Sequence, residues 1–362
     1  MAQTPPCLLF IPVSGPAGAG EFYRCQNLAA AVLSTARQRG LPAPAMHLCV
    51  SREAQVTQLA PFHYHSLSAS PTRCSGEIIA LLETLQPQVV VFDSSARGDQ
   101  IKAARRLGAR LVYISSRPNR RRKGFAWHKL RHLHEHWVLT PPQAHQLTPW
   151  ERFKTRITET GVRFFSALMP PPDGQRRQQF LQSSDIPGSG YTLFVSGGGG
   201  GTINGEATAA VFQQAAREFH QRSGSPTLFI AGPLASIALE NGTDRLELPS
   251  VPSETLSDLI SGAQLVVTGG GSIVQQCLTL GTPCVAIPAG GKDQPARLAL
   301  LHRQGVIATS PPGLQALVTT VLEVSQDAAR RQELVTQASE QGYRNGLEEA
   351  SGVLLEQLAG RG

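Results

Sequence analysis

The chain has 362 residues, of which 41% are hydrophobic, and a formal net charge of +7. This length and apolar content are enough for two domains with packed cores, and the positive charge favours anionic partners such as phosphates or an acidic membrane surface. The sequence has no zinc-finger spacing, no aromatic–basic RNA motif and no run near the roughly 18 apolar residues of a spanning helix, so neither a nucleic-acid partner nor a membrane span is expected.

The N-terminus and the cysteines point to an intracellular chain. The first apolar run, residues 8–13, has no positive segment before it, so we expect a first strand and not a signal peptide. Six cysteines form no C-x-x-C pair and lie in apolar contexts, which predicts buried thiols in a reducing compartment. We expect a cytoplasmic protein, soluble or peripheral on the inner membrane.

Short apolar runs alternate with helical patterns along the whole chain. In the first half, strands are expected at residues 8–13, 46–50, 89–92, 111–114 and 137–139, and helices at residues 21–39, 76–85 and 100–107. The second half repeats this rhythm, with strands near Thr192, Leu228, Leu265, Cys284 and Val306. Such alternation is typical of a parallel sheet with helices on both faces.

The predicted fold class is α/β, with two doubly wound, Rossmann-like domains that face each other across a cleft. Residues 169–190 are rich in Pro, Gly, Ser and Gln, so we expect a linker there. The domains are predicted at residues 1–168 and 191–345, followed by a C-terminal helix at residues 346–362; residues 327–358 read as helix throughout. Parallel sheets of this kind bind ligands beyond the carboxyl ends of their strands.

Two glycine runs in the second half each separate an apolar strand from a helix. Residues 192–195 run into the glycines at 197–201, and residues 265–267 run into the glycines at 269–271 before a helix that begins at Ser272. Glycine lets a backbone come close to a ligand, and the free N–H groups of a new helix can hold an anion. The pattern predicts a sugar-phosphate or nucleotide site; the alternative is that these glycines are only tight turns.

Residues 253–294 resemble the C-terminal domain of GT-B glycosyltransferases, particularly the MurG-like enzymes that transfer N-acetylglucosamine, in the order of their motifs: SETLSDLISGAQLVVTGGGSIVQQCLTLGTPCVAIPAGGKDQ. The resemblance implies a nucleotide-sugar donor, expected to be a UDP-sugar. It places Gly270, Gly271 and Ser272 at the donor diphosphate, Gly199, Gly200, Gly201 and Thr202 on its other side, Gly232 near the base, and Gln294, after Asp293, at the sugar hydroxyls.

One position departs from this family pattern. The family usually has a glutamate five residues before the G-x-P glycine, where it bonds both ribose hydroxyls, and this chain has Gln276 there. An amide can still bond a diol but carries no charge. The resemblance therefore implies an altered or weaker nucleotide selectivity.

The first strand is followed by the sequence GPAGAGEFYRCQNLA, residues 15–29. It resembles the G-x-G-H-x-x-R-C-x-x-L-A loop and helix of the hydrolase that removes UDP from a sugar in pseudaminic acid biosynthesis. Gly18, Gly20 and Arg24 match this pattern, whereas Glu21 replaces the catalytic histidine. A carboxylate there can accept a proton from an acceptor hydroxyl, so Glu21 is the candidate base; the alternative is a helix residue that complements the helix dipole.

Asp93, at the end of the strand VVVFD, is the alternative base. Arg24 is expected to orient Glu21, to contact the diphosphate or to form a surface ion pair. The sequence contains no D-x-D pair to hold a cation, so no metal or other cofactor is expected, and helix N-termini with neutral donors would stabilise the departing nucleotide. His128 and His132 have metal-compatible spacing but are better explained as part of a solvated helix.

Residues 115–137 combine basic and aromatic side chains. Phe125, Trp127 and Leu130 lie among the basic residues Arg117, Arg120, Arg121, Arg122, Lys123, Lys129 and Arg131. This pattern suits an anionic membrane surface or a lipid-linked diphosphate acceptor, and a solvated helix face is the open alternative.

These observations predict a glycosyltransferase that moves a sugar from a nucleotide-diphosphate donor to an acceptor hydroxyl, in a single metal-independent displacement with inversion. Two alternatives stay open. One is a nucleotide-sugar hydrolase, in which water replaces the acceptor. The other is a non-catalytic sugar-nucleotide-binding subunit that needs a partner chain.

Overall fold

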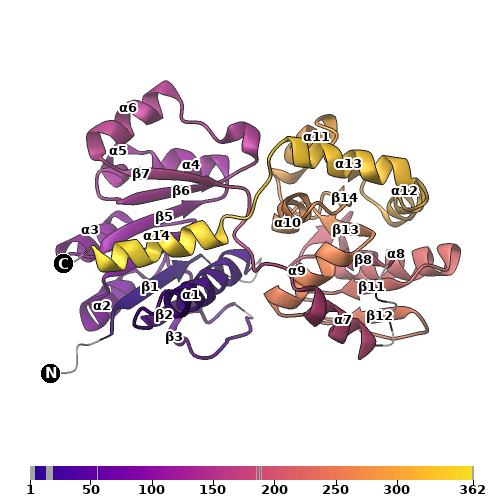
Figure 1. The fold of residues 1–362 in the computed structure, drawn as a ribbon, viewed down its shortest axis with the longest axis horizontal. Coiled ribbons are helices and arrows are strands. Elements are labelled where there is room, and N and C mark those ends of the chain that lie inside the picture. Colours follow the sequence, from indigo (N-terminus) through magenta and orange to yellow (C-terminus); the bar gives the residue numbers. More distant parts are fainter. Residues whose placement is uncertain are drawn as a thin grey trace. The chain divides into compact units, whose positions relative to one another are not determined.

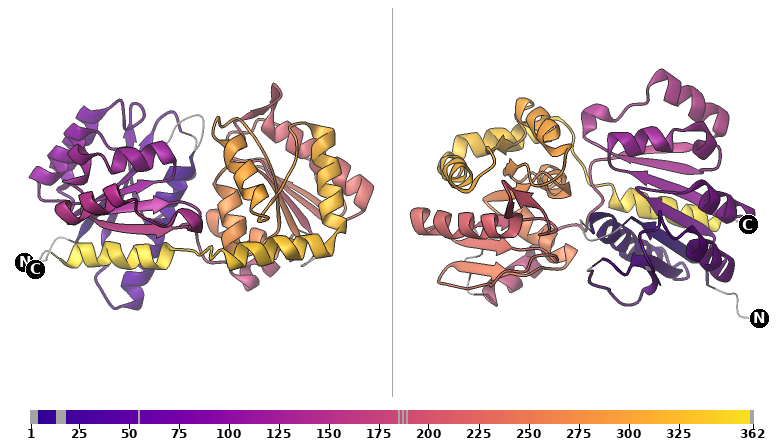
Figure 2. Two further views of the ribbon diagram at one scale, coloured as in Figure 1. Left: turned by 90° about the horizontal axis from the view of Figure 1, so that it is seen from above. Right: turned by 180° about the vertical axis from the view of Figure 1, so that it is seen from behind.

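The computed structural model describes residues 5–13, 19–54, 56–184, 186, 188 and 190–360. The chain divides into two compact units, Met1–Leu168 with Asn345–Gly362 (unit 1) and Met169–Arg344 (unit 2). Each unit has a parallel sheet between two helical layers (Figures 1 and 2). The predicted class, α/β with two Rossmann-like domains, is confirmed.

Unit 1 contains a seven-stranded parallel sheet with the order β3-β2-β1-β4-β5-β6-β7. Its strands are β1 (Cys7–Pro12), β2 (Ala45–Ser51), β3 (His63–Leu67), β4 (Val89–Asp93), β5 (Arg110–Ser115), β6 (Glu135–Leu139) and β7 (Gly161–Phe165). Its helices are α1 (Gly20–Gln38), α2 (Ser75–Leu85), α3 (Gly98–Arg106), α4 (Pro118–Gly124), α5 (Trp127–Leu130), α6 (Pro149–Thr158) and α14 (Leu347–Ala359), with a 3-10 turn, η1 (Pro142–Ala144).

The side chains of β1 alternate between two cores of unit 1. Leu8 and Phe10 pack against α1 and α14, whereas Leu9 and Ile11 pack with residues of α2 and α3. The neighbouring strand β4 is buried along its whole length. A continuous apolar run is what a parallel strand covered on both faces requires.

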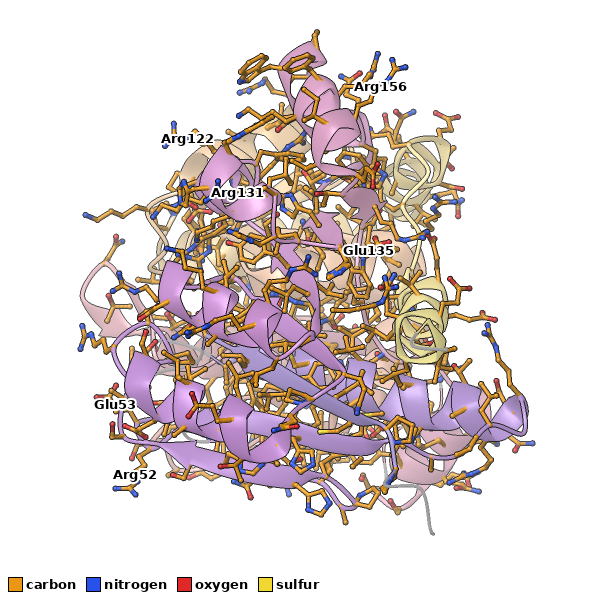
Figure 3. The ribbon with its side chains drawn as sticks, turned by 90° about the vertical axis from the view of Figure 1, so that its left-hand side faces the viewer. Arg52, Glu53, Arg122, Arg131, Glu135 and Arg156 are labelled. Carbon is orange, nitrogen blue, oxygen red and sulfur yellow. The ribbon has the colours of Figure 1, made fainter. Side chains whose placement is uncertain are left out.

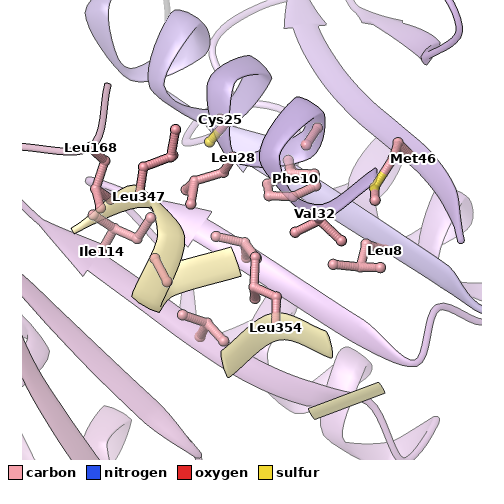
Figure 4. Packing of buried hydrophobic residues seen from close by; sticks show 14 of the residues in the cluster. Leu8, Phe10, Cys25, Leu28, Val32, Met46, Ile114, Leu168, Leu347 and Leu354 are labelled. Carbon is pink, nitrogen blue, oxygen red and sulfur yellow. The ribbon is translucent and has the colours of Figure 1, made fainter. Parts of the chain in front are cut away.

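The last helix, α14, belongs to unit 1 and packs on α1. Leu347 and Leu354 lie in one core with Leu28 of α1 (Figure 4). Thr35 Oγ1 of α1 lies 2.9 Å from Ser351 Oγ of α14, within hydrogen-bond distance. Each fully buried leucine stabilises the unit by roughly 1.5–3 kcal/mol, so α14 is an integral part of this unit.

Unit 2 contains a six-stranded parallel sheet with the order β12-β11-β8-β13-β14-β15 and a separate antiparallel pair, β10-β9. Its strands are β8 (Thr192–Val195), β9 (Thr202–Ile203), β10 (Glu206–Ala207), β11 (Thr227–Ile230), β12 (Arg245–Leu248), β13 (Leu265–Gly269), β14 (Cys284–Ile287) and β15 (Ala308–Thr309). Its helices are α7 (Gly174–Gln182), α8 (Thr208–Ser223), α9 (Ser253–Gly262), α10 (Ser272–Leu280), α11 (Gln294–Arg303), α12 (Leu314–Gln326) and α13 (Ala328–Glu340).

The segment at residues 169–190, expected as a linker, contains helix α7. Asp173 caps this helix by accepting from Gln175 N at 2.8 Å, and Arg176 Nη2 donates to Asp258 Oδ1 of α9 at 2.8 Å. Asp258 is wholly buried. These contacts tie α7 to α9 within unit 2.

Besides the short pair β9 and β10, three strands of the two parallel sheets are missing from the sequence prediction, and all three lie at sheet edges. They are β3, with the sequence HYHSL, β7, with GVRFF, and β12, with RLEL. An edge strand is covered less completely than a central one, so it tolerates polar residues and loses the apolar run that marks a strand.

The helical stretch predicted over residues 327–358 is interrupted in the structure. The structure has two helices there, α13 and α14, which end up in different units. Gly342, just after α13, has φ of +76°, a value that glycine adopts without steric cost. The amphipathic pattern of the sequence continues across this break, so the end of α13 could not be predicted from the pattern.

All six cysteines are free and buried, as the sequence predicts. Among the described residues, no helix has the length and apolar character needed to cross a membrane.

Candidate functional site

In unit 1, the carboxyl end of β4 lies beside the end of β1 and the start of α1. The two strands pair in parallel, with Pro12 opposite Asp93. Gly20 begins α1, and Glu21 follows in its first turn. The fold therefore brings Glu21 to the strand end that carries Asp93, while Gly18 lies outside the described residues.

The side chains of Arg24, Asp93, Ser94 and Glu21 belong to one hydrogen-bonded network at this strand end, in which Cys25 Sγ also donates to Asp93 Oδ2 at 3.8 Å. The Arg24 guanidinium donates from Nε to Asp93 Oδ2 and from Nη2 to Asp93 Oδ1, each at 2.7 Å. Ser94 Oγ lies 3.1 Å from Glu21 Oε1 and 3.1 Å from Asp93 Oδ1. Ser94 thus bridges the two carboxyl groups that the sequence analysis offered as alternative bases.

The two carboxyl groups differ in access. Asp93 is 0% exposed, and Arg24 holds both of its oxygens. Burial raises the pKa of the Asp93 carboxyl, whereas the Arg24 guanidinium acts to lower it. The bidentate contact is that of an ion pair. Glu21 is only half-buried, so its carboxylate is the more accessible of the two.

Ser94 is a residue that the sequence analysis missed. Its φ of +66° lies in the left-handed region, which is uncommon for residues other than glycine. Its backbone is held on both sides, because Ser94 N donates to Ile114 O at 2.9 Å and Tyr113 Oη donates to Ser94 O at 3.4 Å. No spacing in the sequence signals this residue, since its role depends on a backbone conformation.

In unit 2, four adjacent strands end in turns that contain glycine. The turns follow β8 at residues 197–201, β11 at Gly232, β13 at Gly270 and Gly271, and β14 at Gly290. The four strands are neighbours in one parallel sheet, in the order β11-β8-β13-β14. All four turns therefore lie at the same carboxyl edge, where sheets of this kind bind ligands.

These turns pack closely against one another. A Cβ atom added to Gly199 would lie 2.7 Å from Ala231 O, and one added to Gly201 would lie 3.2 Å from Ala289 O. A Cβ atom added to Gly290 would lie 3.7 Å from Gly201 Cα. The turn after β8 thus touches the turns after β11 and β14, and at Gly199 the backbone of the neighbouring turn leaves no room for a side chain.

The start of α10 presents main-chain donors at the same edge. Gly270 is buried, and its N–H donates to Ile287 O at 3.0 Å, which fixes the turn. Gly271 is the N-cap residue and Ser272 the first helical residue, and both are exposed. The first N–H groups of a helix have no acceptor within that helix, so this terminus can receive an anion.

The Asp-Gln pair at the start of α11 lies against the turn after β13. Gln294 Oε1 accepts from Ala289 N at 2.6 Å, and Arg297 Nη1 donates to Asp293 Oδ2 at 2.7 Å. Arg297 Nη2 also donates to Gly270 O. The sequence analysis missed Arg297, although its position one helical turn after Asp293 could have indicated that it lies on the same side of α11.

The remaining predicted donor residues occupy the same edge of unit 2. Gly200 and Thr202 are exposed, with Thr202 beginning β9. Gly232 is buried and has φ of +89°. Gln276 is half-buried on α10, one helical turn after Ser272. The ligand roles of these residues stay predictions.

The solvated helix expected at His128 and His132 is shorter than predicted. His128 is exposed on α5, a single turn that ends at Leu130, before His132. His136 lies wholly buried in β6, with its Nε2 2.9 Å from Ser115 Oγ. Burial lowers the pKa of His136 to about 3 and, together with the charge of Arg105, that of His134 to about 4. In the described part of the chain, no group of three or more His, Cys, Asp or Glu side chains is arranged to hold a metal ion.

The basic stretch at residues 115–137 also differs from its sequence interpretation. Phe125 and Leu130 are buried, Arg121 pairs with Glu151 at 2.8 Å, and Lys129 Nζ donates to Ala96 O at 2.7 Å. The outward-facing basic residues of the stretch are Arg117, Arg122, Lys123 and Arg131. Part of the stretch is therefore structural, and part of it is surface.

Two shallow cavities lie in unit 1, and neither contains a predicted site residue. One, of about 530 Å³, is lined by Ile79, Asp99, Lys102, Arg105, Arg106 and His132. The other, of about 400 Å³, lies by Leu41 and His63. Because Glu21 lies at the strand ends of unit 1 and the glycine turns lie at those of unit 2, we place a candidate site at the strand ends of each unit.

No family model and no curated protein sequence matches the chain. Solved structures do match. Spinosyn forosaminyltransferase SpnP superposes with a TM-score of 0.61 at 14% identity, over 98% of this chain and 100% of that one. UGT2 of Phytolacca americana, solved with UDP-2fluoro-glucose and pterostilbene, gives a TM-score of 0.61 at 15% identity, over 98% and 100% of the two chains.

A third match broadens the range of chemistry seen on this fold. A putative UDP-N-acetylglucosamine 2-epimerase from Listeria monocytogenes gives a TM-score of 0.57 at 10% identity, over 98% of this chain and 95% of that one. Identities this low speak for the fold alone. The chain has the GT-B fold, as these structures do.

Proposed function

We propose that this protein is a glycosyltransferase that moves a sugar from a nucleotide-diphosphate donor, a UDP-sugar, to an acceptor hydroxyl. The observation that carries the proposal is the set of four packed glycine turns at one edge of unit 2, beside the open N-terminus of α10. Backbone donors without side chains suit a diphosphate, which must come close to the chain.

In this proposal, unit 2 holds the donor. The diphosphate lies at Gly270, Gly271 and Ser272, with the turn at residues 199–202 on its other side. Arg297, which already touches Gly270 O, adds a positive charge beside the leaving group. Gly232 lies towards the base, Gln276 towards the ribose hydroxyls, and Gln294, after Asp293, towards the sugar.

Unit 1 supplies the proton acceptor in the proposed reaction. Glu21 takes the proton of the acceptor hydroxyl while that oxygen forms its bond to the anomeric carbon. The bond from this carbon to the donor diphosphate breaks, and the nucleotide diphosphate leaves with the electron pair, so the configuration inverts. Ser94 orients Glu21, and the Arg24–Asp93 ion pair fixes Ser94.

The reaction is proposed to need no metal ion. The sequence contains no D-x-D pair, whereas the α10 N-terminus and Arg297 offer positive charge where negative charge develops. We further propose a MurG-like role with a lipid-linked acceptor and a peripheral position on the cytoplasmic side of a membrane. The exposed basic residues Arg117, Arg122, Lys123 and Arg131 support that position.

The proposal is tested by incubating the protein with a panel of nucleotide sugars, with and without a broad set of hydroxyl acceptors, in EDTA. We expect thermal stabilisation by the cognate UDP-sugar and release of UDP that depends on an acceptor. Release of free sugar at full rate without an acceptor would replace the transferase by a hydrolase. Binding without turnover on any acceptor would indicate a non-catalytic subunit.

A further inference from the structure

Helix α6 of unit 1 carries an exposed apolar stripe. Trp150, Phe153 and Ile157 are 61%, 49% and 55% exposed. Their spacing of three and four residues places them on one face of the helix. Large apolar side chains this exposed, and grouped on one face, mark a surface that meets an apolar partner.

Polar side chains of α6 fix the helix to the body of unit 1. Arg121 donates from Nε and Nη2 to the two Glu151 oxygens at 3.1 and 2.8 Å, and Lys154 Nζ donates to Phe125 O at 3.0 Å. Thr155 is buried. These contacts fix the orientation of α6, so its apolar stripe faces outward.

The exposed rings are already arranged as a platform. The Trp150 and Phe153 rings stack with centroids 5.2 Å apart and an interplanar angle of 11°. Lys154 Nζ lies 5.2 Å from the centroid of the Trp150 ring. Stacking and a cation over the ring reduce the side-chain freedom that binding would otherwise have to remove.

Basic side chains surround the stripe. On α6 itself, Arg152 and Arg156 are exposed, and the packing of α5 against α3, α4 and α6 places further basic residues in the same region. Figure 3 shows Arg122, Arg131 and Arg156 along this side of unit 1. Of the acidic residues of this helix and its C-cap, Glu151 is neutralised by Arg121, and only Glu159 is exposed.

We infer that α6 lies in the interface of an anionic lipid bilayer, with Trp150, Phe153 and Ile157 among the acyl chains and the arginines at the headgroups. Aromatic residues and a basic rim on one face are the features that hold an interfacial helix on such a membrane. A second copy of the chain is disfavoured as the occupant, because self-association would bring this basic rim against itself. The inference deepens the proposed peripheral position and rests on it, but it is independent of donor binding.

Vesicle binding by the full-length protein tests this inference. Vesicles of phosphatidylcholine with about 30% phosphatidylglycerol should bind the wild type, and pure phosphatidylcholine should bind it far more weakly. The double variant Trp150→Ala/Phe153→Ala should lower the partition coefficient by roughly tenfold or more. Arg152→Glu/Arg156→Glu should lower it by a similar factor at low salt and by less at high salt.

The matched controls make the same kinds of substitution at other exposed positions of the protein. Leu41→Asn removes another exposed apolar residue of unit 1, and Arg222→Glu/Arg303→Glu makes the same change in net charge on exposed positions of unit 2. Both should bind vesicles nearly as the wild type does. In a Trp127→Phe background, the emission of Trp150 should shift to the blue on binding, and brominated lipids should quench it, because Trp137 is already buried.

Several results would overturn the inference. They are a wild type that does not bind anionic vesicles, α6 variants that bind as well as the wild type, or binding that ignores lipid charge. A wild-type dimer that Trp150→Ala/Phe153→Ala converts to monomers, without vesicle binding, would assign the stripe to a second copy. Thermal shifts with UDP-sugars are measured in parallel. A wild type that shows no such shift would contradict the proposed donor site and would not change the interpretation of vesicle binding.

Discussion

The candidate sites of unit 1 and unit 2 consist of different chemical groups. Unit 1 uses charged side chains, with Arg24 and Asp93 buried against each other and Ser94 bridging to Glu21. Unit 2 uses the main chain, with glycine turns packed around the start of α10. Side chains can move a proton, whereas backbone amides can only bind. This difference is the basis of our proposal that unit 1 takes part in proton transfer and unit 2 in diphosphate binding.

The comparison is tested most strongly by Glu21→Gln. The amide oxygen can still accept from Ser94, but the side chain can no longer take a proton, so turnover should fall by about 10²–10⁴-fold. The affinity for UDP should stay within about twofold if unit 2 alone binds it. Steady-state kinetics and calorimetry measure the two quantities.

Glu53→Gln provides the matched control for that variant. Glu53 is exposed in the same unit and is not one of the network residues; Figure 3 labels its position. It should leave both turnover and affinity unchanged. Unchanged turnover in Glu21→Gln would remove Glu21 from the mechanism.

The buried ion pair of unit 1 gives the next largest effect. Arg24→Met leaves the Asp93 carboxylate buried without its partner and should lower the free energy of unfolding of unit 1 by roughly 3–5 kcal/mol. The double variant Arg24→Met/Asp93→Leu removes both charges and should recover much of this loss. Urea unfolding followed by tryptophan fluorescence reports on unit 1, because all three tryptophans, Trp127, Trp137 and Trp150, lie there.

Equal stability of the single variant and the wild type would mean that Asp93 and Arg24 do not depend on each other. In that case the network would not fix Ser94, and the supporting role proposed for this pair would be wrong.

Acid should affect unit 1 through His136. Its folded-state pKa of about 3 lies below the ordinary value of 6.5, so its neutral form stabilises the fold above pH 6.5, and this stability is lost as the pH falls towards 3. Between pH 6.5 and 4.5 the loss should be roughly 2–3 kcal/mol. His136→Gln should be less stable at neutral pH but should show a shallower loss on acidification.

The measurement is urea unfolding by tryptophan fluorescence at the two pH values. Parallel pH dependence in wild type and variant would show that other groups cause the acid sensitivity of unit 1.

The smallest of these effects is expected in unit 2. Arg297→Gln removes a charged donor beside Gly270 and should weaken UDP binding by roughly 10- to 150-fold, and turnover at saturating donor should also fall because this charge lies beside the leaving group. Ser272→Ala should weaken it by a similar or smaller factor. Arg303→Gln, an exposed residue in the last turn of the same helix, is the control and should bind UDP normally. Normal binding by Arg297→Gln would place the diphosphate elsewhere.

The same contrast explains what the sequence could predict. The buried central strands β1, β4, β8 and β13 appear as continuous apolar runs, and the glycine turns after β8 and β13 stand out by composition. Turns of this kind are local, so their sequence is sufficient to find them. The polar edge strands β3 and β12 lack this signal.

The network of unit 1 could not be predicted as a network. Arg24 and Asp93 lie 69 residues apart, and their contact depends on the pairing of β1 with β4. The role of Ser94 depends on a backbone angle that the neighbouring residues in the sequence do not indicate. The docking of α14 on α1 was likewise hidden, because an amphipathic helix shows that it packs but not on which partner.

The central claim is that main-chain amides of unit 2 hold the donor diphosphate without a cation. Amide hydrogen exchange of the full-length protein, with and without UDP in EDTA, tests it most directly. We predict new protection of amides at residues 197–202 and 269–274 together, with an affinity that Mn²⁺ does not change. Protection confined to other residues, or UDP binding that EDTA abolishes and Mn²⁺ restores, would contradict the claim.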